Sequence, residues 1–368
     1  MKDQMTKPSL RIFDQHAGDL RGKRICLIGG AGFIGHNMAL QLVARGADVQ
    51  VIDGLQVNHL VHIASSPQLE HQSMYLKFLH ERLALLEESG VALKVVDARD
   101  YLKLGTAISE FKPQVIIQLA AIAHANRSNK DPYSTFDHSL RTLENALDCA
   151  RSSAEHFIYF SSSMVYGNFQ SATIDENHPL NPIGIYGALK LGGEKMVIAY
   201  QQVFDLPYTI IRPAALYGPR CVSRRVGQIF IENAFSGKPL RVEGDGLESV
   251  DFTFIEDLVD GICRVIVSPK SRNQIFNLTH GDARTIKDLA DIVCDQIPGT
   301  SVEYTKRDDL RPFRGSMNVD KARELIGYAP QNAVEIGMPK YIDWYRSIGF
   351  GASKQDRDAS NALARKTA

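Results

Sequence analysis

The sequence predicts a doubly wound α/β fold, built on a parallel sheet, with a smaller C-terminal α+β lobe. The first observation behind this prediction is an apolar run at 24–28 that ends in a cluster of glycines. Residues 33–45 follow with apolar side chains at helical spacing, and a second apolar run at 48–52 ends at Asp53. Strand–helix–strand units of this kind build parallel sheets with helices on both faces. A change to short mixed elements near residue 214 predicts the smaller lobe.

The same unit continues along the chain. The stretch 54–92, which we call the insertion, is longer than a usual connection between strand and helix. Its part MYLKFLHERLALLEES has helical spacing, so we expect an extra helix there rather than a structureless loop. Further strands are expected at 93–96, 115–119, 156–160 and 208–212, and further helices at 142–151 and 186–204.

The chain is expected to divide into four segments. Residues 1–22 are a polar lead-in, and residues 23–213 hold the large sheet domain. Residues 214–350 should form mainly the second lobe, with some exchange of chain between it and the first domain. The tail 351–368 is polar and alanine-rich, and we expect it to be flexible.

The overall composition excludes several classes of function. Lysine plus arginine and aspartate plus glutamate both number 42, so the formal net charge is zero, and no basic stripe indicates a nucleic-acid partner. No apolar run is long enough to cross a bilayer, and the N-terminal residues lack the apolar centre of a signal peptide. The five cysteines are scattered and odd in number, as in reduced proteins. We therefore expect a cytoplasmic protein that binds neither nucleic acid nor membrane.

The glycine cluster GGAGFIG follows the first expected strand and opens the first expected helix. In that context it is typical of a Rossmann-type dinucleotide site. Gly29 allows the tight turn, Gly32 lets the backbone approach a diphosphate, and Gly35 lets the helix pack closely on the strand. The diphosphate is expected on the N–H groups at the start of the helix, beside Phe33 and Ile34.

An acidic residue ends the second expected strand. Asp53 is placed to accept hydrogen bonds from the adenosine ribose hydroxyls, and its carboxylate would repel a 2′-phosphate. No arginine or lysine follows closely in GLQVNHL, so NAD is favoured over NADP as the cofactor. Asp97, next to Ala98, is a second candidate for the adenine end, although it could equally cap the following turn. Ala120 and Ala121 are expected beside the nicotinamide.

A serine-rich segment and a tyrosine–lysine pair complete the expected catalytic site. Tyr186 and Lys190 are four residues apart, so they share one face of an expected helix. The lysine ammonium and a cationic nicotinamide lower the pKa of the phenol, which can then remove a hydroxyl proton while hydride leaves for NAD. A serine of FSSSMVYG orients that oxygen and relays the proton. A lone YxxxK pair is a common surface feature, but together with the serine cluster and the glycine loop it indicates a catalytic pair.

From about residue 24 to residue 345 the chain resembles the extended short-chain dehydrogenase/reductase family, in its nucleotide-sugar epimerase/dehydratase branch. The resemblance rests on GGAGFIG, VIIQLAAIAH, FSSSMVYG, YGALK, IIRPAALYGP, GDGLESVDFTFIEDL and DKARELIGYAP, in the expected order. It implies a catalytic Ser or Thr three residues before the hydrophobic-Tyr-Gly triplet, which is Ser162 here, with Ser163 the near alternative. It also implies a homodimer formed through two helices of the large lobe.

The resemblance implies several reactions that share oxidation at sugar C4 to a 4-keto intermediate. Similar 4,6-dehydratases carry Asp-Glu after the catalytic residue, similar decarboxylases carry Glu at the second position, and similar fucose-type epimerase-reductases carry Cys there. This chain has Ser163 and Met164, and Met164 can neither give nor take a proton. A 4-epimerase needs no such helper, because the ketosugar rotates and takes hydride back on its other face. By elimination we expect a nucleotide-sugar 4-epimerase, unless another segment supplies an acid.

The substrate end departs from the pattern of the family. Val250 stands where members often have the arginine of an Arg-Asp-Phe triplet, and that arginine commonly contacts the diphosphate of the substrate. Arg224, Arg225, Arg311 or Arg314 could supply the charge, because a diphosphate favours planar guanidinium partners. Arg311 is slightly favoured, since family members keep an arginine there, although each of these could also be a solvated surface residue.

The histidines do not indicate a metal site. His124 borders the expected pocket, either as an acid/base or, more plainly, as a lining residue. The histidines of the insertion do not repeat at metal-ligand spacing and are expected at the surface; they are His59, His62, His71 and His80.

Three functions are compatible with these patterns. The first is a 4-epimerase acting on a nucleotide-linked hexose or hexuronic acid, with NAD held tightly. The second is a net oxidoreductase or a lyase of the same family, namely a dehydratase, decarboxylase or 4-keto reductase. The third is a non-catalytic NAD-binding sensor, and the intact Ser162, Tyr186 and Lys190 count against it.

Overall fold

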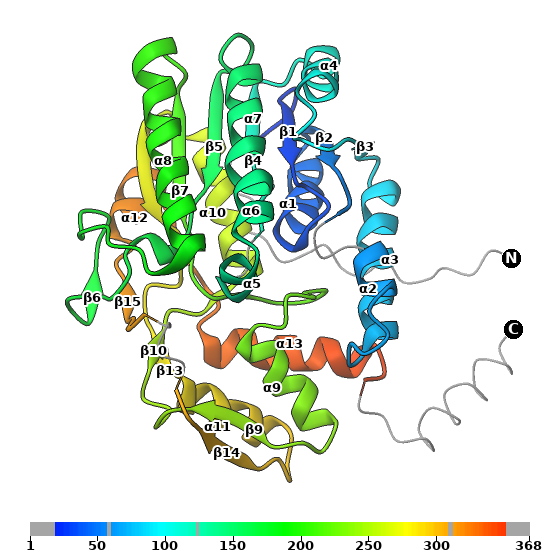
Figure 1. Cartoon of the computed structure of the whole chain (residues 1–368), viewed down its shortest axis with the longest axis vertical. Helices are drawn as coiled ribbons and strands as arrows, with labels where there is room; N and C mark the ends of the chain where they lie inside the picture. The colour runs from blue at the N-terminus through cyan, green and yellow to red at the C-terminus, as the bar shows by residue number, and fades with distance from the viewer. Residues whose placement is uncertain (1–18, 57–59, 123–124, 308–311, 351–368) are drawn as a thin grey trace, which may run out of the picture.

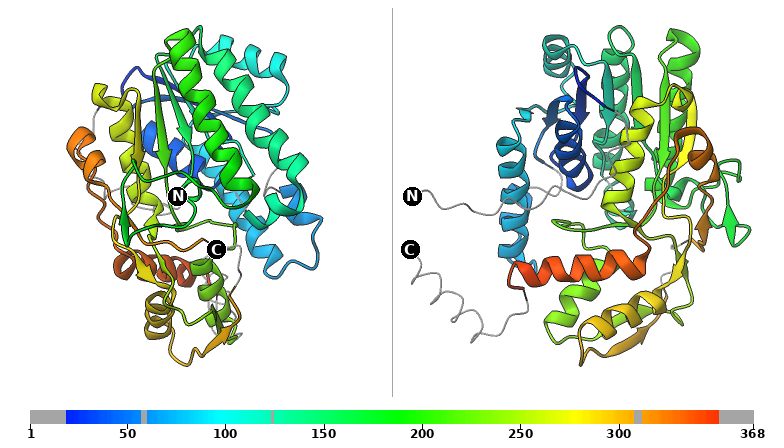
Figure 2. Two further views of the ribbon diagram at one scale, coloured as in Figure 1. Left: turned by 60° about the vertical axis from the view of Figure 1, so that its left-hand side comes forward. Right: turned by 180° about the vertical axis from the view of Figure 1, so that it is seen from behind.

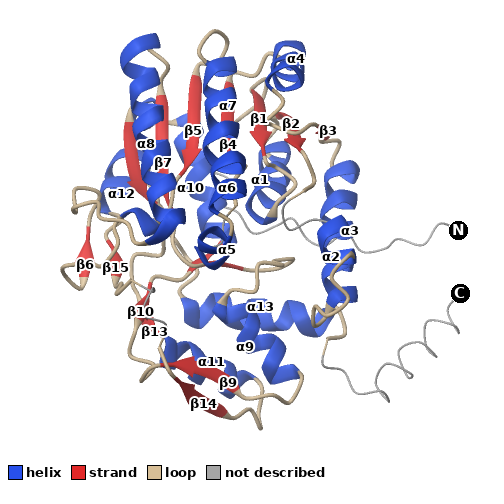
Figure 3. Ribbon diagram, viewed as in Figure 1, coloured by secondary structure: helices blue, strands red, loops and turns tan. Residues whose placement is uncertain are grey.

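The computed structural model describes residues 19–56, 60–122, 125–307 and 312–350. At its centre lies a seven-stranded sheet in the order β12-β7-β5-β4-β1-β2-β3, and each neighbouring pair is parallel. Figure 1 shows these strands side by side, and Figure 3 shows them among the helices. The strands are β1 (Arg24–Ile28), β2 (Asp48–Asp53), β3 (Ala92–Val95), β4 (Val115–Gln118), β5 (His156–Phe160), β7 (Tyr208–Arg212) and β12 (Gln274–Asn277).

The chain winds outward from β1 in both directions, which confirms the predicted doubly wound fold of the Rossmann type. The strand order reverses between β1 and β4, and ligands bind in the crevice at such a switch point. The expected strands are present, with ends that differ by about one residue. Strand β12 is not among the expected strands, because it is short and follows residue 214; it pairs with β7 at the edge of the sheet.

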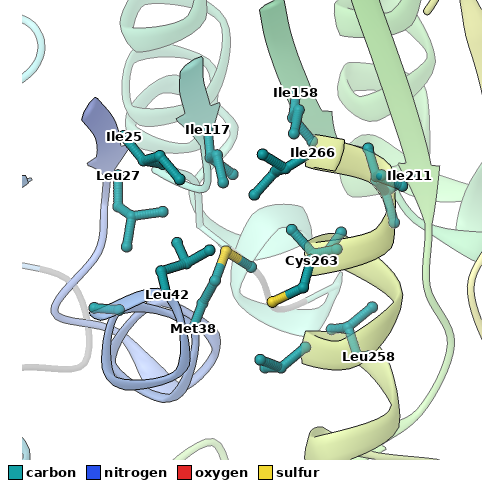
Figure 4. Packing of buried hydrophobic residues seen from close by; sticks show 14 of the residues in the cluster. Ile25, Leu27, Met38, Leu42, Ile117, Ile158, Ile211, Leu258, Cys263 and Ile266 are labelled. Carbon is teal, nitrogen blue, oxygen red and sulfur yellow. The ribbon is translucent and has the colours of Figure 1, made fainter. Parts of the chain in front are cut away.

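Helices cover both faces of the sheet, as the two views of Figure 2 show. Side chains along each strand alternate between the faces, so Ile25 and Leu27 of β1 lie in one core cluster and Cys26 and Ile28 in the other. Figure 4 shows the first cluster, in which Met38 of the helix after β1 lies near Cys263 of a second helix on the same face. The first face carries α1 (Phe33–Ala44), α10 (Ile255–Val267) and α12 (Asp320–Ile326), and the second carries α4 (Tyr101–Phe111), α7 (Thr142–Ala150) and α8 (Gly184–Phe204).

The second lobe lies below the large sheet in Figure 1 and has an apolar core of its own. It contains α9 (Val226–Phe235), α11 (Ile286–Gln296) and α13 (Val334–Ser347), with the paired strands β9 (Leu240–Glu243) and β14 (Val302–Thr305). Three further strand pairs are β8 (Leu216–Tyr217) with β11 (Thr253–Phe254), β10 (Ser249–Val250) with β13 (Arg284–Thr285), and β6 (Thr173–Ile174) with β15 (Ser316–Met317). The remaining elements are α2 (Leu60–Ala64), α5 (Ala125–Lys130), α6 (Pro132–Phe136), the π-helical turn η1 (Asp137–Arg141) and the 3₁₀ turns η2 (Ser163–Val165) and η3 (Pro269–Ser271).

Helix α3 (Gln72–Glu88) joins the two lobes and is the extra helix expected in the insertion. Tyr75, Phe78 and Leu79 belong to the core of the second lobe, whereas Leu86 belongs to the core beneath the sheet. Figure 1 shows α3 running beside the sheet, with its lower end near α13. The insertion therefore ties the two lobes together along one side.

Two expected segments lie mostly or wholly outside the described residues. They are the lead-in up to residue 18 and the tail 351–368. Within the part of the chain that is described, no helix has both the length and the apolar character needed to span a bilayer. All five cysteines are free thiols.

Helix α8 lies close to strand β5 because a glycine stands at the contact. A Cβ atom on Gly193 would collide with Oη of Tyr159, which is buried under the helix. The preceding Gly192 has space around it, since a Cβ there would meet nothing closer than Cδ1 of Leu140, at 3.9 Å. The two adjacent glycines therefore differ in what they allow.

We predict opposite effects for alanine at these two positions. Gly193→Ala should lower the free energy of unfolding by about 1–3 kcal/mol, because the helix must move off the sheet to make room for the methyl group. Gly192→Ala is the matched control and should raise it by up to about 1 kcal/mol, because alanine favours the helix. Urea unfolding of both variants measures the difference, and equal effects would contradict the close contact.

Candidate functional site

A cavity of about 560 Å³ lies between the carboxyl ends of the strands and the second lobe. His124 and Arg311 lie outside the described residues. All the other residues that the sequence places in the site line this one cavity; they are Gly29, Gly32, Phe33, Ile34, Gly35, Asp53, Asp97, Ala98, Ala120, Ala121, Ser162, Ser163, Tyr186, Lys190, Arg224, Arg225 and Arg314.

The glycine loop has the geometry that a dinucleotide needs. Gly29 has a φ of 82°, and a Cβ there would be 2.5 Å from the backbone nitrogen of Ala120. A Cβ on Gly35 would collide with the backbone of Gly30, so this glycine lets α1 pack on the loop. A Cβ on Gly32 would have ordinary contacts only, and no side chain caps the first turn of α1. The N–H groups at the start of this helix can therefore receive an anionic diphosphate.

Asp53 ties the end of β2 to the glycine loop. Its Oδ2 accepts a hydrogen bond from the N–H of Ala31, at 3.0 Å, and its Oδ1 accepts one from the N–H of Leu55, at 2.8 Å. Burial raises the pKa of this carboxyl group, and the two N–H groups oppose the shift. Each oxygen keeps a further lone pair, which leaves acceptors for the hydroxyls of a ribose.

Asp97 is held by a partner that the sequence analysis did not identify. Arg99 donates to both carboxylate oxygens, with Nη2 at 2.7 Å from Oδ2, and holds the pKa of Asp97 at about 2. Gln56 also donates to Oδ2, and Arg99 forms a second ion pair with Asp137. The carboxylate thus belongs to a network at the end of β3. The arginine two residues after Asp97 in the sequence could have indicated this ion pair.

The residues that the sequence predicts to be catalytic meet where α8 passes the serine segment. Tyr186 forms a hydrogen bond with Ser162, which also begins the turn η2 by accepting from the N–H of Met164. Lys190 lies one helical turn after Tyr186, and its Nζ donates to the carbonyl oxygen of Phe160 at 2.6 Å. Burial lowers the pKa of Lys190 to about 8. A phenol, a hydroxyl and an ammonium are therefore placed together at the edge of the cavity.

The electrostatics of Tyr186 differ from the expectation in one respect. Burial raises the pKa of the phenol, and the groups that oppose this shift are the charge of Arg225 and the hydrogen bond with Ser162. Lys190, which was expected to lower this pKa, instead donates to a backbone carbonyl of β5. Arg225, expected only as a substrate contact, therefore also acts on the phenol.

A buried polar network supports the catalytic face of α8. Glu194 accepts from Ser161 at 2.5 Å and forms a bidentate pair with Arg212, with Nη2 at 2.7 Å from Oε2. Both side chains of this pair are 1% exposed. Arg212 also donates to Tyr166, which donates to Asn277. Glu194 follows Lys190 by four residues, so the helical spacing that places Lys190 also places Glu194 on the inner face.

Another element fixes the start of α8. The residue before the helix, Ile183, provides no side-chain cap. Asn129 of α5 lines the cavity, and its Oδ1 accepts a hydrogen bond from the N–H of Ile185 at 3.1 Å. This N–H lies one residue before Tyr186, so Asn129 caps the helix beside the phenol. The sequence analysis did not identify this residue, because nothing local connects α5 with α8.

The far end of the cavity combines apolar and charged side chains. Val250, in β10, is 3% exposed and lines the cavity, as does Arg314. Glu248 is buried between two arginines, with Nη2 of Arg314 at 3.5 Å and Nε of Arg307 at 3.7 Å. Arg224, one of the expected substrate contacts, has a left-handed backbone conformation with a φ of 48°. Arg224, Arg225 and Arg314 line the same cavity as Val250.

We predict that the buried pair of Glu194 and Arg212 is essential for stability. Glu194→Gln should lower the free energy of unfolding by about 3–5 kcal/mol, because it leaves a buried guanidinium without its counter-charge. The matched control is Glu335→Gln, whose partner Arg284 is partly exposed, and its effect should stay within about 1 kcal/mol. Denaturant unfolding of both variants measures the contrast, which would vanish if Glu194 were solvated.

Comparison with known proteins places the chain among relatives of several activities. A UDP-glucose 4-epimerase of Mycolicibacterium smegmatis is 29% identical over 334 residues, covering 88% of this chain and 99% of the relative. UDP-glucuronic acid decarboxylase 4 of Arabidopsis thaliana is 28% identical, covering 92% of this chain and 72% of the relative. A crystal structure of a dTDP-glucose 4,6-dehydratase double mutant from Streptomyces venezuelae, with NAD bound, has a TM-score of 0.77 at 25% identity, covering 88% of this chain and 97% of that one.

The model of the NAD dependent epimerase/dehydratase family matches residues 25–279, which is more than half of the chain. The match includes the glycine loop, the serine segment and the helix that carries Tyr186 and Lys190. The open surface at Gly32 and the acceptor at Asp53 fit the cofactor of this family, which is NAD. The chain therefore belongs to the NAD dependent epimerase/dehydratase family, within the extended short-chain dehydrogenases/reductases.

Proposed function

We propose that this protein is a nucleotide-sugar 4-epimerase. The observation that carries the proposal is Met164, the residue two positions after Ser162, in the turn η2 beside Tyr186. Its thioether cannot exchange a proton, and the relatives with other chemistries need a proton carrier near the sugar. Epimerases, a decarboxylase and a dehydratase all occur among the relatives, and among these activities Met164 favours the epimerase.

The residues of the chain have separate tasks in this reaction. Tyr186, as phenolate, removes the proton of the sugar C4 hydroxyl, and Ser162 orients that oxygen through its own hydroxyl. The glycine loop and Asp53 would hold NAD, which when bound would supply the hydride-transfer chemistry at C4. Arg225 stabilises the phenolate by its charge, and Lys190 braces the helix against β5. The ketosugar rotates before Tyr186 returns the proton.

The surroundings of Tyr186 support an epimerase over a lyase. Burial raises the pKa of the phenol, and the charge of Arg225 and the hydrogen bond with Ser162 oppose this shift. The carboxylates that line the described cavity are Asp53, Asp97, Glu243 and Glu248, which belong to β2, to the end of β3, and to the strands of the second lobe or the loop between them. A dehydratase needs a further acid or base beside the sugar, and the turn η2 after Ser162 carries no carboxylate, since its residues are Ser163, Met164 and Val165.

We predict that the protein interconverts a pair of C4-epimeric nucleotide sugars without added cofactor. The protein is incubated with UDP-, dTDP- and GDP-linked hexoses and hexuronic acids, and the products are identified by NMR. A 4-epimer should form with no net absorbance change at the reduced-nicotinamide band, because hydride returns to the sugar. A 4-keto product, released CO₂ or consumption of free NAD would contradict the epimerase and indicate one of the other reactions.

Tyr186→Phe tests the assigned mechanism in the same assay. Loss of the phenolic base should lower turnover by at least about 10²-fold, because general-base catalysis contributes that much. Bound NAD, measured after acid release, should remain. Tyr133→Phe is a matched control at an 87%-exposed tyrosine and should keep full turnover. Retained activity in Tyr186→Phe would overturn the mechanism.

Asp53→Ala should weaken NAD and reduce its preference over NADP. The variant loses the acceptor for the ribose hydroxyls and the negative charge that repels a 2′-phosphate. Dissociation constants for NAD and NADP, measured by calorimetry on wild type and variant, give the selectivity. An unchanged ratio of the two constants would remove Asp53 from this role.

A further inference from the structure

The insertion brings a buried arginine to the wall of the cavity. Arg82 lies on α3, between the residues that pack into the second lobe and those that pack beneath the sheet. Arg82 is 2% exposed, and it lines the same cavity as the glycine loop. Since α3 is held at both ends, the position of this guanidinium is set by the fold rather than by the arginine itself.

The charge of Arg82 has few partners within the protein. Its Nε and Nη2 both donate to the carbonyl oxygen of Arg220, with Nε at 3.1 Å. Among the described residues, no carboxylate lies within ion-pair distance of it, although the charge of Asp53 acts on it from further away. Burial lowers the pKa of Arg82 to about 10, so the side chain remains charged at neutral pH. A buried cation that faces a cavity in this way calls for an anion.

The neighbouring arginine is neutralised, which makes a useful contrast. Arg220 forms an ion pair with Glu81 of α3, with Nη1 at 3.2 Å from Oε1, and its Nε donates to Nε2 of His36. Burial and the two arginines hold the pKa of His36 well below its usual range, so the ring is neutral and its Nδ1 donates to the carbonyl of Gly32. Arg220 therefore needs no ligand, and Arg82 does.

The groups around Arg82 locate it relative to the cofactor. It acts electrostatically on Asp53, at the ribose end, and on His36, one turn into α1. The first turn of α1 is where the diphosphate of a dinucleotide meets the backbone N–H groups. Hydrogen bonds link Arg82 to Arg220 and Arg220 to His36 of α1, and Arg82 lines the same cavity as Asp53 and the glycine loop.

We infer that Arg82 of the insertion binds the diphosphate of NAD. A planar guanidinium can donate two parallel hydrogen bonds to phosphate oxygens, and the anion supplies the counter-charge that the protein lacks here. The 2′-position of the ribose is the less suitable target, because a phosphate there would lie against the Asp53 carboxylate. The inference rests on NAD as the cofactor and is independent of which sugar reaction follows.

The test compares ligands that differ only in phosphate. The full-length protein, stripped of bound nucleotide, is titrated calorimetrically with ADP, adenosine and 2′-AMP, as wild type and as Arg82→Gln. We expect Arg82→Gln to weaken ADP by about 10- to 100-fold, since a charge-assisted hydrogen bond is removed. The affinity for adenosine should change less than about twofold, because adenosine makes no phosphate contact.

The other outcomes overturn the inference. Equal losses for ADP and adenosine would show that Arg82 only shapes the cavity. No loss for ADP would show that the guanidinium does not reach the diphosphate, and a larger loss for 2′-AMP would move the contact to the ribose. The matched control is Lys77→Gln, which removes an exposed cation from the same helix and should leave the ADP-to-adenosine affinity ratio unchanged.

The fold of each variant is checked by its thermal unfolding without nucleotide. If Arg82→Gln does not fold, Arg82→Lys carries the test, because it keeps the charge and loses the bidentate fork. We expect it to weaken ADP by about threefold to tenfold while adenosine binds as before. Unchanged ADP affinity in this variant would overturn the bidentate contact. Neither measurement depends on turnover, so a failed epimerase assay would leave this result standing.

Discussion

The catalytic side of the cavity depends on how closely helix α8 lies against the sheet. A Cβ atom on Gly193 would collide with the hydroxyl of Tyr159 in β5. A Cβ atom on Gly187 would be 2.7 Å from the carbonyl oxygen of Met164 in the serine segment. At this separation the inner face of α8 is shielded from water, so its polar side chains need partners inside the protein. Lys190 donates to a carbonyl of β5, and Glu194 pairs with Arg212. The close packing therefore requires the buried polar network. Both position Tyr186 at the start of the helix.

The buried charges around the cavity fall into two groups. Glu194 and Arg212 neutralise one another within the protein and contribute to structure. Lys190 and Arg82 are cations without a carboxylate at ion-pair distance among the described residues, and burial lowers the pKa of each. Both line the cavity, one at the catalytic end and one at the cofactor end. A ligand that carries hydroxyls at one end and a diphosphate at the other matches this distribution.

Sequence patterns predict the structure where the interacting residues lie close together in the chain. The strand, glycine loop, helix and Asp53 follow one another within a single supersecondary unit, and the spacing of Tyr186 and Lys190 lies within one helix. They fail where the fold joins distant segments. Strand β12 is four residues long and pairs with β7 only in the folded sheet, and Asn129 caps a helix far along the chain. No local pattern of residues specifies such contacts, because they depend on the packing of complete elements.

The choice between NAD and NADP illustrates the same limit. The expectation of NAD rested partly on the absence of a basic residue soon after Asp53 in the chain, yet α3 returns Arg82 to that carboxylate in space. A cation near the ribose would favour a 2′-phosphate, and the Asp53 carboxylate would oppose it. The two carboxylate oxygens of Asp53 are fixed by the N–H groups of Ala31 and Leu55, so the negative charge cannot swing away from the ribose. We therefore expect NAD to be preferred over NADP, because these backbone contacts hold the Asp53 carboxylate in place.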